Sequence, residues 1–284
     1  MTQPIEQEIT RSRRRPINAT LIVGAVLVGV IVATAAVSLV WTPQAPMRVL
    51  STEAYQRPNA EFWLGTDRLR RDVFTQILLG ARTTLLVGIV AVGVAALIGV
   101  PLGILAAMSA GWFGQLIMRS NDILLAFPAL LLAIMFAAIY GGSTQVAMVA
   151  IGIATIPSFA RVTRASALSV LRTEYVTAAR AAGRGPVAIA VRHVLPNVAS
   201  LVIVQASVAF AIAILAEAAL AYLGLGTPTG QPSWGRMLYE AQSTLRSAPH
   251  LVLIPGIAIA WSVLGFNLLG DGLRDYLDPK LEDR

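Results

Sequence analysis

Long runs of apolar residues alternate with shorter polar segments along this chain. A helix rises about 1.5 Å per residue, so roughly 20 apolar residues cross the hydrocarbon core of a bilayer, which is about 30 Å thick. Stretches of that kind are Ala19–Trp41, Thr83–Met108, Leu116–Tyr140, Thr144–Ala165, Val198–Leu223 and Leu251–Leu269. The pattern predicts an all-α integral membrane protein with about six transmembrane helices.

The polar segments between these runs divide the chain. The predicted parts are an N-terminal tail (1–18), a transmembrane anchor (19–41), a segment outside the membrane (42–82), a core of five transmembrane helices (83–275) that contains a polar loop (166–197), and a charged tail (276–284). A signal peptide is the rival interpretation of the first apolar run, but its apolar region would be only about 7–15 residues long. The greater length favours an uncleaved anchor.

Two local features within the predicted spans affect how the helices pack. Gly99 and Gly103 form a G-x-x-x-G pair, which either lets a neighbouring helix approach closely or reflects only the frequency of glycine in membrane helices. Phe127-Pro128 lies inside the third span, and proline there predicts a kink because it removes a backbone hydrogen bond.

Composition supports a membrane location. Apolar residues make up 56% of the 284 residues and charged residues only 13%, whereas soluble domains are nearer a quarter charged. The net charge of +7 comes almost entirely from arginines in clusters, since Lys280 is the only lysine. Long apolar runs separate these clusters, which favours loops at a membrane surface over nucleic-acid binding.

The distribution of arginine predicts the topology. One cluster precedes the first span, and another surrounds the polar loop, where Glu174 is the single acidic residue between Arg161 and Arg192. The positive-inside rule places both clusters in the cytoplasm, and six spans then place both termini there. Segment 42–82 also contains arginines, but four acidic residues accompany them.

The chain lacks the residues for several kinds of chemistry. It has no cysteine, and His193 and His250 are far apart in sequence, so no metal-ligand spacing is present. A Walker A loop needs a lysine before Ser or Thr, but Lys280 precedes Leu281. We find no catalytic motif either. The sequence therefore predicts a non-catalytic subunit, and ATP-driven transport would require a separate ATPase.

The polar loop contains signals for two short helices. Glu174–Ala182 predicts the first, because the acid at its start interacts favourably with the helix dipole and Gly183 suits the position just after its end. Pro186 suits the first turn of a second helix, and we expect Pro196 to end that helix.

One face of the first short helix is smooth. Tyr175, Ala178, Ala179 and Ala182 recur at helical spacing and therefore share a face made mostly of methyl groups. Two interpretations fit this pattern equally well. The helix either inserts as a knob into a partner protein or packs as a loop against its own chain.

Three further residues are candidates for specific roles. Glu217 falls in the fifth span, where a carboxylate is costly and suggests function. Three interpretations are open: it lines the path, forms a hydrogen bond with a neighbouring helix, or is solvated at the membrane interface. We favour the hydrogen bond. Asp122 follows Arg119 at i+3, which predicts a local ion pair. Trp234, in the segment between the last two spans, suits either an interfacial anchor or a docking contact.

The loop resembles the EAA motif of ABC importer permeases, with Glu174, Ala178, Ala179 and Gly183 at the matching positions. The segment R-H-V-L-P-N at 192–197 is similar to the dipeptide, oligopeptide and nickel subgroup. Similar patterns occur at 65–74, 217–226, 232–238 and 266–280, so the resemblance covers about Gly65 to Lys280. Arg70 departs from it, because that subgroup has glycine at this position.

The resemblance implies a type I ABC importer permease fold and a C-type permease subunit in the inner membrane of a prokaryote. The implied partners are a paired B-type permease, two ABC ATPase subunits that bind ATP and Mg²⁺, and an extracytoplasmic binding protein. The implied ATPase-coupling residues are Glu174, Tyr175, Ala178, Ala179, Ala182 and Gly183. The resemblance also implies Trp234 at the binding-protein surface. Glu217 is our candidate for the path or outer gate because its carboxylate falls within a span.

The same resemblance favours di- or oligopeptides as cargo, with nickel or another small solute as the alternative. A secondary transporter is the rival mechanism, but neither inverted repeats nor coupling-ion carboxylates at mid-membrane are evident in the sequence.

Overall fold

Helices form nearly all of the described chain. The structure is a computed structural model that describes residues 18–45, 52–109, 111–228 and 230–277. In chain order its helices are α1 (Ala19–Val40), α2 (Val73–Met108), α3 (Trp112–Ala126), α4 (Ala129–Tyr140), α5 (Thr144–Leu171), α6 (Glu174–Ala181), α7 (Pro186–Ile189), a π-turn (Ala190–Val194), α8 (Leu195–Tyr222), α9 (Trp234–Ala241), a 3₁₀ turn (Gln242–Thr244) and α10 (His250–Leu277).

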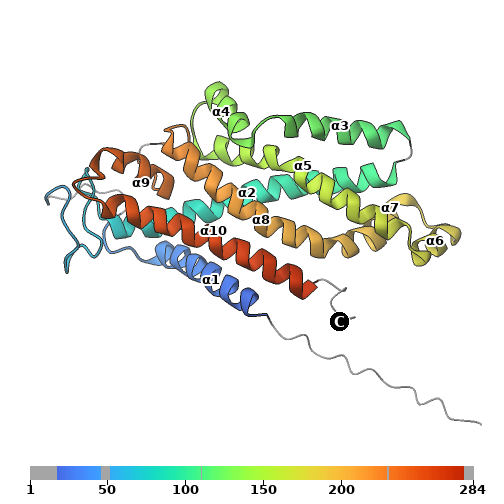
Figure 1. Cartoon of the computed structure of the whole chain (residues 1–284), viewed down its shortest axis with the longest axis horizontal. Helices are drawn as coiled ribbons and strands as arrows, with labels where there is room; N and C mark the ends of the chain where they lie inside the picture. The colour runs from blue at the N-terminus through green and yellow to red at the C-terminus, as the bar shows by residue number, and fades with distance from the viewer. Residues whose placement is uncertain (1–17, 46–51, 110, 229, 278–284) are drawn as a thin grey trace, which may run out of the picture.

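The long helices form one elongated bundle (Figure 1). Within the described residues, five helices are long and apolar enough to cross a membrane, and the bent pair α3 and α4 makes a sixth span if it is counted as one. At one end lie α6, the start of α1 and the end of α10, where Asn18 donates a hydrogen bond to Asp275 at 2.9 Å. We call this the α6 end, and the opposite end, which carries α9, the α9 end.

Glycines allow the helices to approach closely. A Cβ atom on Gly103 would lie 2.5 Å from the backbone oxygen of Ala160, and one on Gly99 would lie 2.7 Å from the Cβ of Phe159. Both neighbours belong to α5, so the G-x-x-x-G pair of α2 is the surface against which α5 packs. The close-approach interpretation of this pair is therefore confirmed.

Several predicted boundaries differ from the structure. α2 begins at Val73 rather than Thr83, because Asp72 caps it by accepting hydrogen bonds from the amide and hydroxyl of Thr75. α5 continues past Ala165 to Leu171, and α10 continues past Leu269 to Leu277. The long helices therefore extend beyond their apolar windows.

The third predicted span is broken rather than gently kinked. α3 and α4 meet at Phe127-Pro128 with an angle of 81° between them. Pro128 has extended backbone angles and is the residue before α4, so it starts the second helix instead of continuing the first. The position predicted for the kink is correct.

Candidate functional site

Helix α6 is a short projection at one end of the bundle, and its last turn is closed by a Schellman motif. Gly183 has φ +77° and donates to the carbonyl of Arg180 at 3.0 Å, while Arg184 donates to the carbonyl of Ala179 at 3.1 Å. These bonds satisfy carbonyls that the end of a helix leaves free, and the positive φ favours glycine. The predicted positions of Glu174 in the first turn and Gly183 after the last turn are confirmed.

One side chain fastens α6 to the bundle. Val176 is fully buried in a cluster that includes Leu171, Ile189 and Val194. Every other residue of α6 is exposed or partly exposed. Val176 was not among the residues expected from the sequence, although it is the one large aliphatic residue of this short helix.

The opposite side of α6 is free of contacts that would cover it within the described chain. Ala178 and Ala182 are exposed, Ala179 is half-buried, and Tyr175 is 46% exposed while its ring lies 5.9 Å from the ring of His193. Packing against its own chain is confirmed in part, and insertion into a partner protein stays a prediction. The helix packs on its own chain through Val176, and it presents the predicted smooth face outward.

The second short helix does not end at Pro196, which corrects the prediction. α7 begins at Pro186, passes through the π-turn Ala190–Val194 and continues directly into α8. In the π-turn, Leu195 donates to Ala190, five residues earlier. This wider turn comes just before Pro196 and replaces the α-helical hydrogen bond to the fourth preceding residue with one to the fifth. The proline ring therefore does not meet the carbonyl that it would clash with in an α-helix, and the helix continues.

A second polar site lies at the α9 end around Glu217. The carboxylate is 2% exposed and accepts a hydrogen bond from the Thr227 hydroxyl at 3.0 Å. The Thr144 hydroxyl, at the start of α5, lies 3.3 Å from that of Thr227 and 3.2 Å from the side-chain oxygen of Gln231. The predicted hydrogen bond is confirmed, although its donor lies in the segment after α8 and not on a neighbouring helix. Solvation at the interface is wrong because the fold buries the carboxylate.

Trp234 is part of the core, which corrects its predicted docking role. Its side chain is 3% exposed, and its indole nitrogen donates to the carbonyl of Ile77 at 3.1 Å. A Cβ on Gly80 would lie 2.5 Å from the indole ring, so α2 has no side chain where the indole packs. Trp234 therefore fixes α9 to α2, and its ring is not available to a partner.

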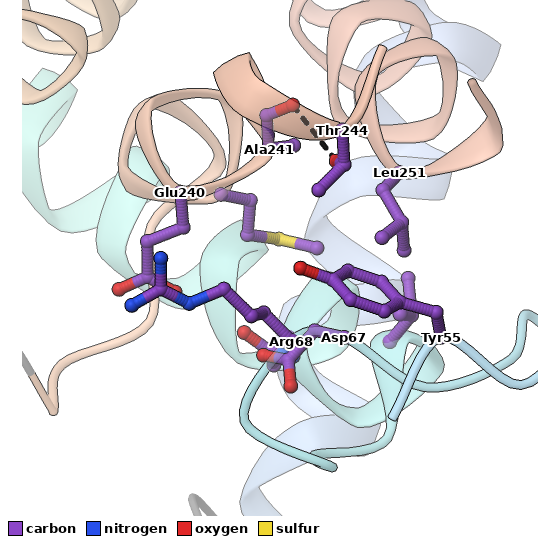
Figure 2. A pocket seen from close by; sticks show the side chains of 10 residues that line it. Tyr55, Asp67, Arg68, Glu240, Ala241, Thr244 and Leu251 are labelled. Atoms are coloured by element: carbon purple, nitrogen blue, oxygen red, sulfur yellow. Dashed lines mark hydrogen bonds between the residues drawn. The ribbon is translucent and has the colours of Figure 1, made fainter. Parts of the chain in front are cut away.

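An ion network joins α9 to the turn before α2. Arg71, 5% exposed, pairs with Asp67 at 2.6 Å and with Glu240 of α9, while Glu240 also pairs with Arg236 at 3.0 Å. Figure 2 shows Arg68 and Tyr55 facing α9 and the turn that follows it across a small pocket. The motif at 65–74 contained Asp67 and Arg71, but their distant partner Glu240 had no signal in the sequence.

The backbone conformation at Arg70 shows why glycine is expected at this position. It has φ +59°, which is the left-handed region that glycine adopts without strain. Asp67 holds this turn by accepting hydrogen bonds from the amides of Leu69 and Arg71, both at 2.8 Å. The turn is therefore kept, and the arginine occupies a backbone conformation suited to glycine.

A cavity of about 470 Å³ opens beside the ion network. Its lining consists of Arg68, Leu69, Arg236, Tyr239, Glu240, Gln242 and Ser243. Charged and polar side chains and the ring of Tyr239 therefore gather at the surface of the α9 end.

Asp122 is paired differently from the prediction. Its carboxylate lies 2.8 Å from the guanidinium of Arg161 on α5, instead of pairing with Arg119 on its own helix. Because α3 and α5 pack side by side (Figure 1), a residue on the neighbouring helix reaches Asp122.

Comparisons with known proteins agree with this architecture. Residues 99–283 match the family described as binding-protein-dependent transport system inner membrane component. The chain is 43% identical to the dipeptide transport system permease protein DppC of Alkalihalophilus pseudofirmus, covering 93% of this chain and 87% of the relative. It is 45% identical to the glutathione transport system permease protein GsiD of Pectobacterium atrosepticum, over 79% of this chain and 75% of the relative.

A further relative and a solved structure extend the comparison. The di/tripeptide transport system permease protein DppC of Pseudomonas aeruginosa is 46% identical, over 79% of this chain and 74% of the relative. A chain from an inward-facing conformation of the MetNI methionine ABC transporter has a TM-score of 0.60 at 18% identity, covering 72% of this chain and 97% of that one. The family match covers most of the chain, the relatives are more than 40% identical, and the fold agrees. This chain therefore belongs to the binding-protein-dependent transport system inner membrane components, the permease subunits of ABC importers.

Proposed function

We propose that this protein forms half of the translocation path of an ATP-driven importer of di- or oligopeptides. The relatives named above are permeases for dipeptides, di/tripeptides and glutathione, which is itself a small peptide. In this proposal a B-type permease supplies the other half of the path. A binding protein outside the membrane delivers the cargo.

Helix α6 is the proposed coupling element, and its exposed smooth face is the observation that carries the proposal. Two separate ATPase subunits bind ATP and Mg²⁺ and hydrolyse the ATP, and one of them receives α6 in a cleft. Ala178, Ala179 and Ala182 offer a surface with few side-chain atoms to clash, and Tyr175 adds a large contact at its edge. Glu174 and Gly183 set the two ends of the helix. ATPase closure then biases the path between inward- and outward-facing states.

The proposed topology places the α6 end in the cytoplasm and the α9 end outside. The arginines near α6 and the N-terminal arginines of the sequence support this orientation. Segment 42–82 and the surface with Arg68, Leu69 and Tyr239 then face the binding protein. Glu217 supports the outer gate by tying α8 to the segment that follows it and to the start of α5.

Uptake in proteoliposomes tests the cargo and the energy source. The chain is reconstituted with its partner permease, ATPases and binding protein, and entry of a labelled dipeptide is measured with and without ATP. We expect uptake only with ATP and only with the binding protein. ATP-dependent entry of nickel in place of peptide would favour the alternative cargo, and peptide entry driven by an ion gradient without ATP would favour a secondary transporter.

Copurification of the ATPase subunits tests the coupling role of α6. Gly183→Arg places a side chain at a residue with φ +77° beside the smooth face, and we expect ATPase binding and uptake to be lost. Gly230→Arg is the matched control, because Gly230 also has a positive φ and open space around it but lies in the segment before α9. Normal ATPase binding and uptake by Gly183→Arg would contradict the proposal.

A further inference from the structure

A charged pair lies exposed on the face that α3 and α5 share. The side chains of Arg161 and Asp122 are 59% and 57% exposed and 2.8 Å apart. Asp122 lies about 15 Å along α3 from Trp112, and Arg161 lies about 15 Å along α5 from Leu171. Trp112 and Leu171 are the ends of these helices nearest α6. Within the predicted spans Leu116–Tyr140 and Thr144–Ala165, Asp122 lies about 9 Å and Arg161 about 6 Å from the end nearest α6, so both charges lie in the half of the membrane toward the α6 end.

Polar residues extend from this pair toward the α6 end. Along α3 the exposed residues at helical spacing are Gln115, Arg119 and Asp122, and along α5 they are Arg161, Ala165, Ser169 and Arg172. The two helices run side by side in opposite directions (Figure 1). This line of side chains is therefore mainly polar between the Asp122–Arg161 pair and the end that carries α6, while Trp112, Leu116 and Ile123 on the adjoining side of α3 are also exposed.

The outer face of α2 provides a contrast at the same depth. Leu97, Pro101 and Leu105 share one exposed side of α2, and Leu97 is 78% exposed. Such an apolar stripe suits lipid. Charged side chains within a membrane face the interior of a protein or a water-filled cavity because exposure to hydrocarbon is costly.

We propose that the α3–α5 face is a wall of the water-filled translocation path, and that Asp122 and Arg161 are the charged groups it presents to the cargo. This inference rests on the proposed function for the nature of the cargo. A peptide with free termini carries an ammonium group and a carboxylate, which match the Asp122 carboxylate and the Arg161 guanidinium. Without cargo the two side chains neutralise each other. When a peptide passes, its ammonium group pairs with Asp122 and its carboxylate pairs with Arg161.

Cysteine labelling tests whether this face is wet, and the natural absence of cysteine makes each introduced thiol unique. Ala126→Cys lies one turn beyond Asp122 on α3, and Ala165→Cys lies one turn beyond Arg161 on α5; both positions are exposed. Leu97→Cys is the control on the apolar face. It lies about 16 Å from the end of α2 nearest α6, whereas Ala126 lies about 21 Å and Ala165 about 9 Å from the corresponding ends of α3 and α5. The assembled importer in inside-out vesicles is treated with a charged, membrane-impermeant methanethiosulfonate.

We expect both test cysteines to react about tenfold or more faster than the control, because the reactive thiolate forms in water and not in hydrocarbon. Saturating dipeptide, delivered by the binding protein, should slow the labelling. Reaction at the control's slow rate would overturn the proposal and show that lipid or the partner permease covers this face.

The double variant Asp122→Asn with Arg161→Gln tests the contact with cargo. It removes both charges together, so neither is left unpaired, and we expect dipeptide uptake to fall about tenfold through loss of charge-assisted bonds while the complex still assembles. Unchanged uptake would overturn the cargo contact. Fast labelling in an importer that carries no peptide would instead refute the proposed cargo and leave the path wall intact.

Discussion

The attachment of α6 to the bundle depends on one buried side chain, so Val176→Ala is the sharpest test of the local structure. Val176 is the only buried residue of α6. The substitution removes two methyl-sized groups from the cluster with Leu171, Ile189 and Val194. Each buried group contributes about 1 kcal/mol when the cavity is included, so the loss is about 2 kcal/mol. An energy of that size changes a population about thirtyfold.

The expected effect is local opening and not global unfolding. Because the other residues of α6 are at least partly exposed, its attachment has no second buried side chain to replace Val176. Hydrogen exchange on the purified permease measures this opening directly. We expect the amides of α6 to exchange about thirtyfold faster, with the amides of α5 and α8 unchanged.

Val187→Ala is the matched control, because it makes the same chemical change at a residue of α7 that is 75% exposed. Its exchange should match that of the unaltered chain. If Val176→Ala left the exchange of α6 unchanged, the attachment would not depend on this side chain, and the account of α6 given above would be wrong. Equal acceleration in both variants would refute it as well.

Three other substitutions follow from the structure. Arg70→Gly should stabilise the protein by about 0.5–1 kcal/mol, because relief of the left-handed strain exceeds the added freedom of the unfolded chain; a lower melting temperature would contradict this. Gly103→Ala should destabilise the protein by about 1–3 kcal/mol, because it forces a methyl group against Ala160. Gly93→Ala in the same helix is the control, since a Cβ there has nothing within 4 Å. Equal melting temperatures of the two variants would refute the packing argument. Glu217→Gln weakens the bond from the Thr227 hydroxyl and should reduce uptake, and the proposed gate role fails if uptake and assembly are both unchanged.

Periodicity and composition were sufficient for the parts of the fold that depend on local chemistry. Apolar length located the spans, and glycine and proline located the end of α6, the start of α7 and the break before α4. Each of these features depends on residues a few positions apart. The same is true of the face of Ala178 and Ala182, since helical spacing alone decides which residues lie together.

Contacts between distant segments could not be obtained in this way. Asp122 had a suitable partner three residues away, yet it pairs with Arg161 because α5 lies beside α3. Tryptophan is a residue type typical of membrane interfaces, yet Trp234 packs inside the bundle because Gly80 and Gly235 leave room for the close approach. The sequence contains the charges and the glycines, but only the arrangement of the helices decides which of them meet.

That arrangement also decides how a movement of α6 would travel in the proposed importer. Only Arg172 and Thr173 separate α6 from α5, and its buried side chain lies in a cluster with Leu171 of α5 as well as with Ile189 and Val194. Ile189 and Val194 lead directly into α8, which continues without a break to the α9 end and includes Glu217. The span of α3 and α4 is instead interrupted by an 81° bend, which would absorb a displacement at that point. In the proposed importer, a pull on α6 would therefore reach the outer hydrogen-bond network through α8, which carries Glu217, and through α5, which begins at Thr144, and Val176 would be the contact that transmits it.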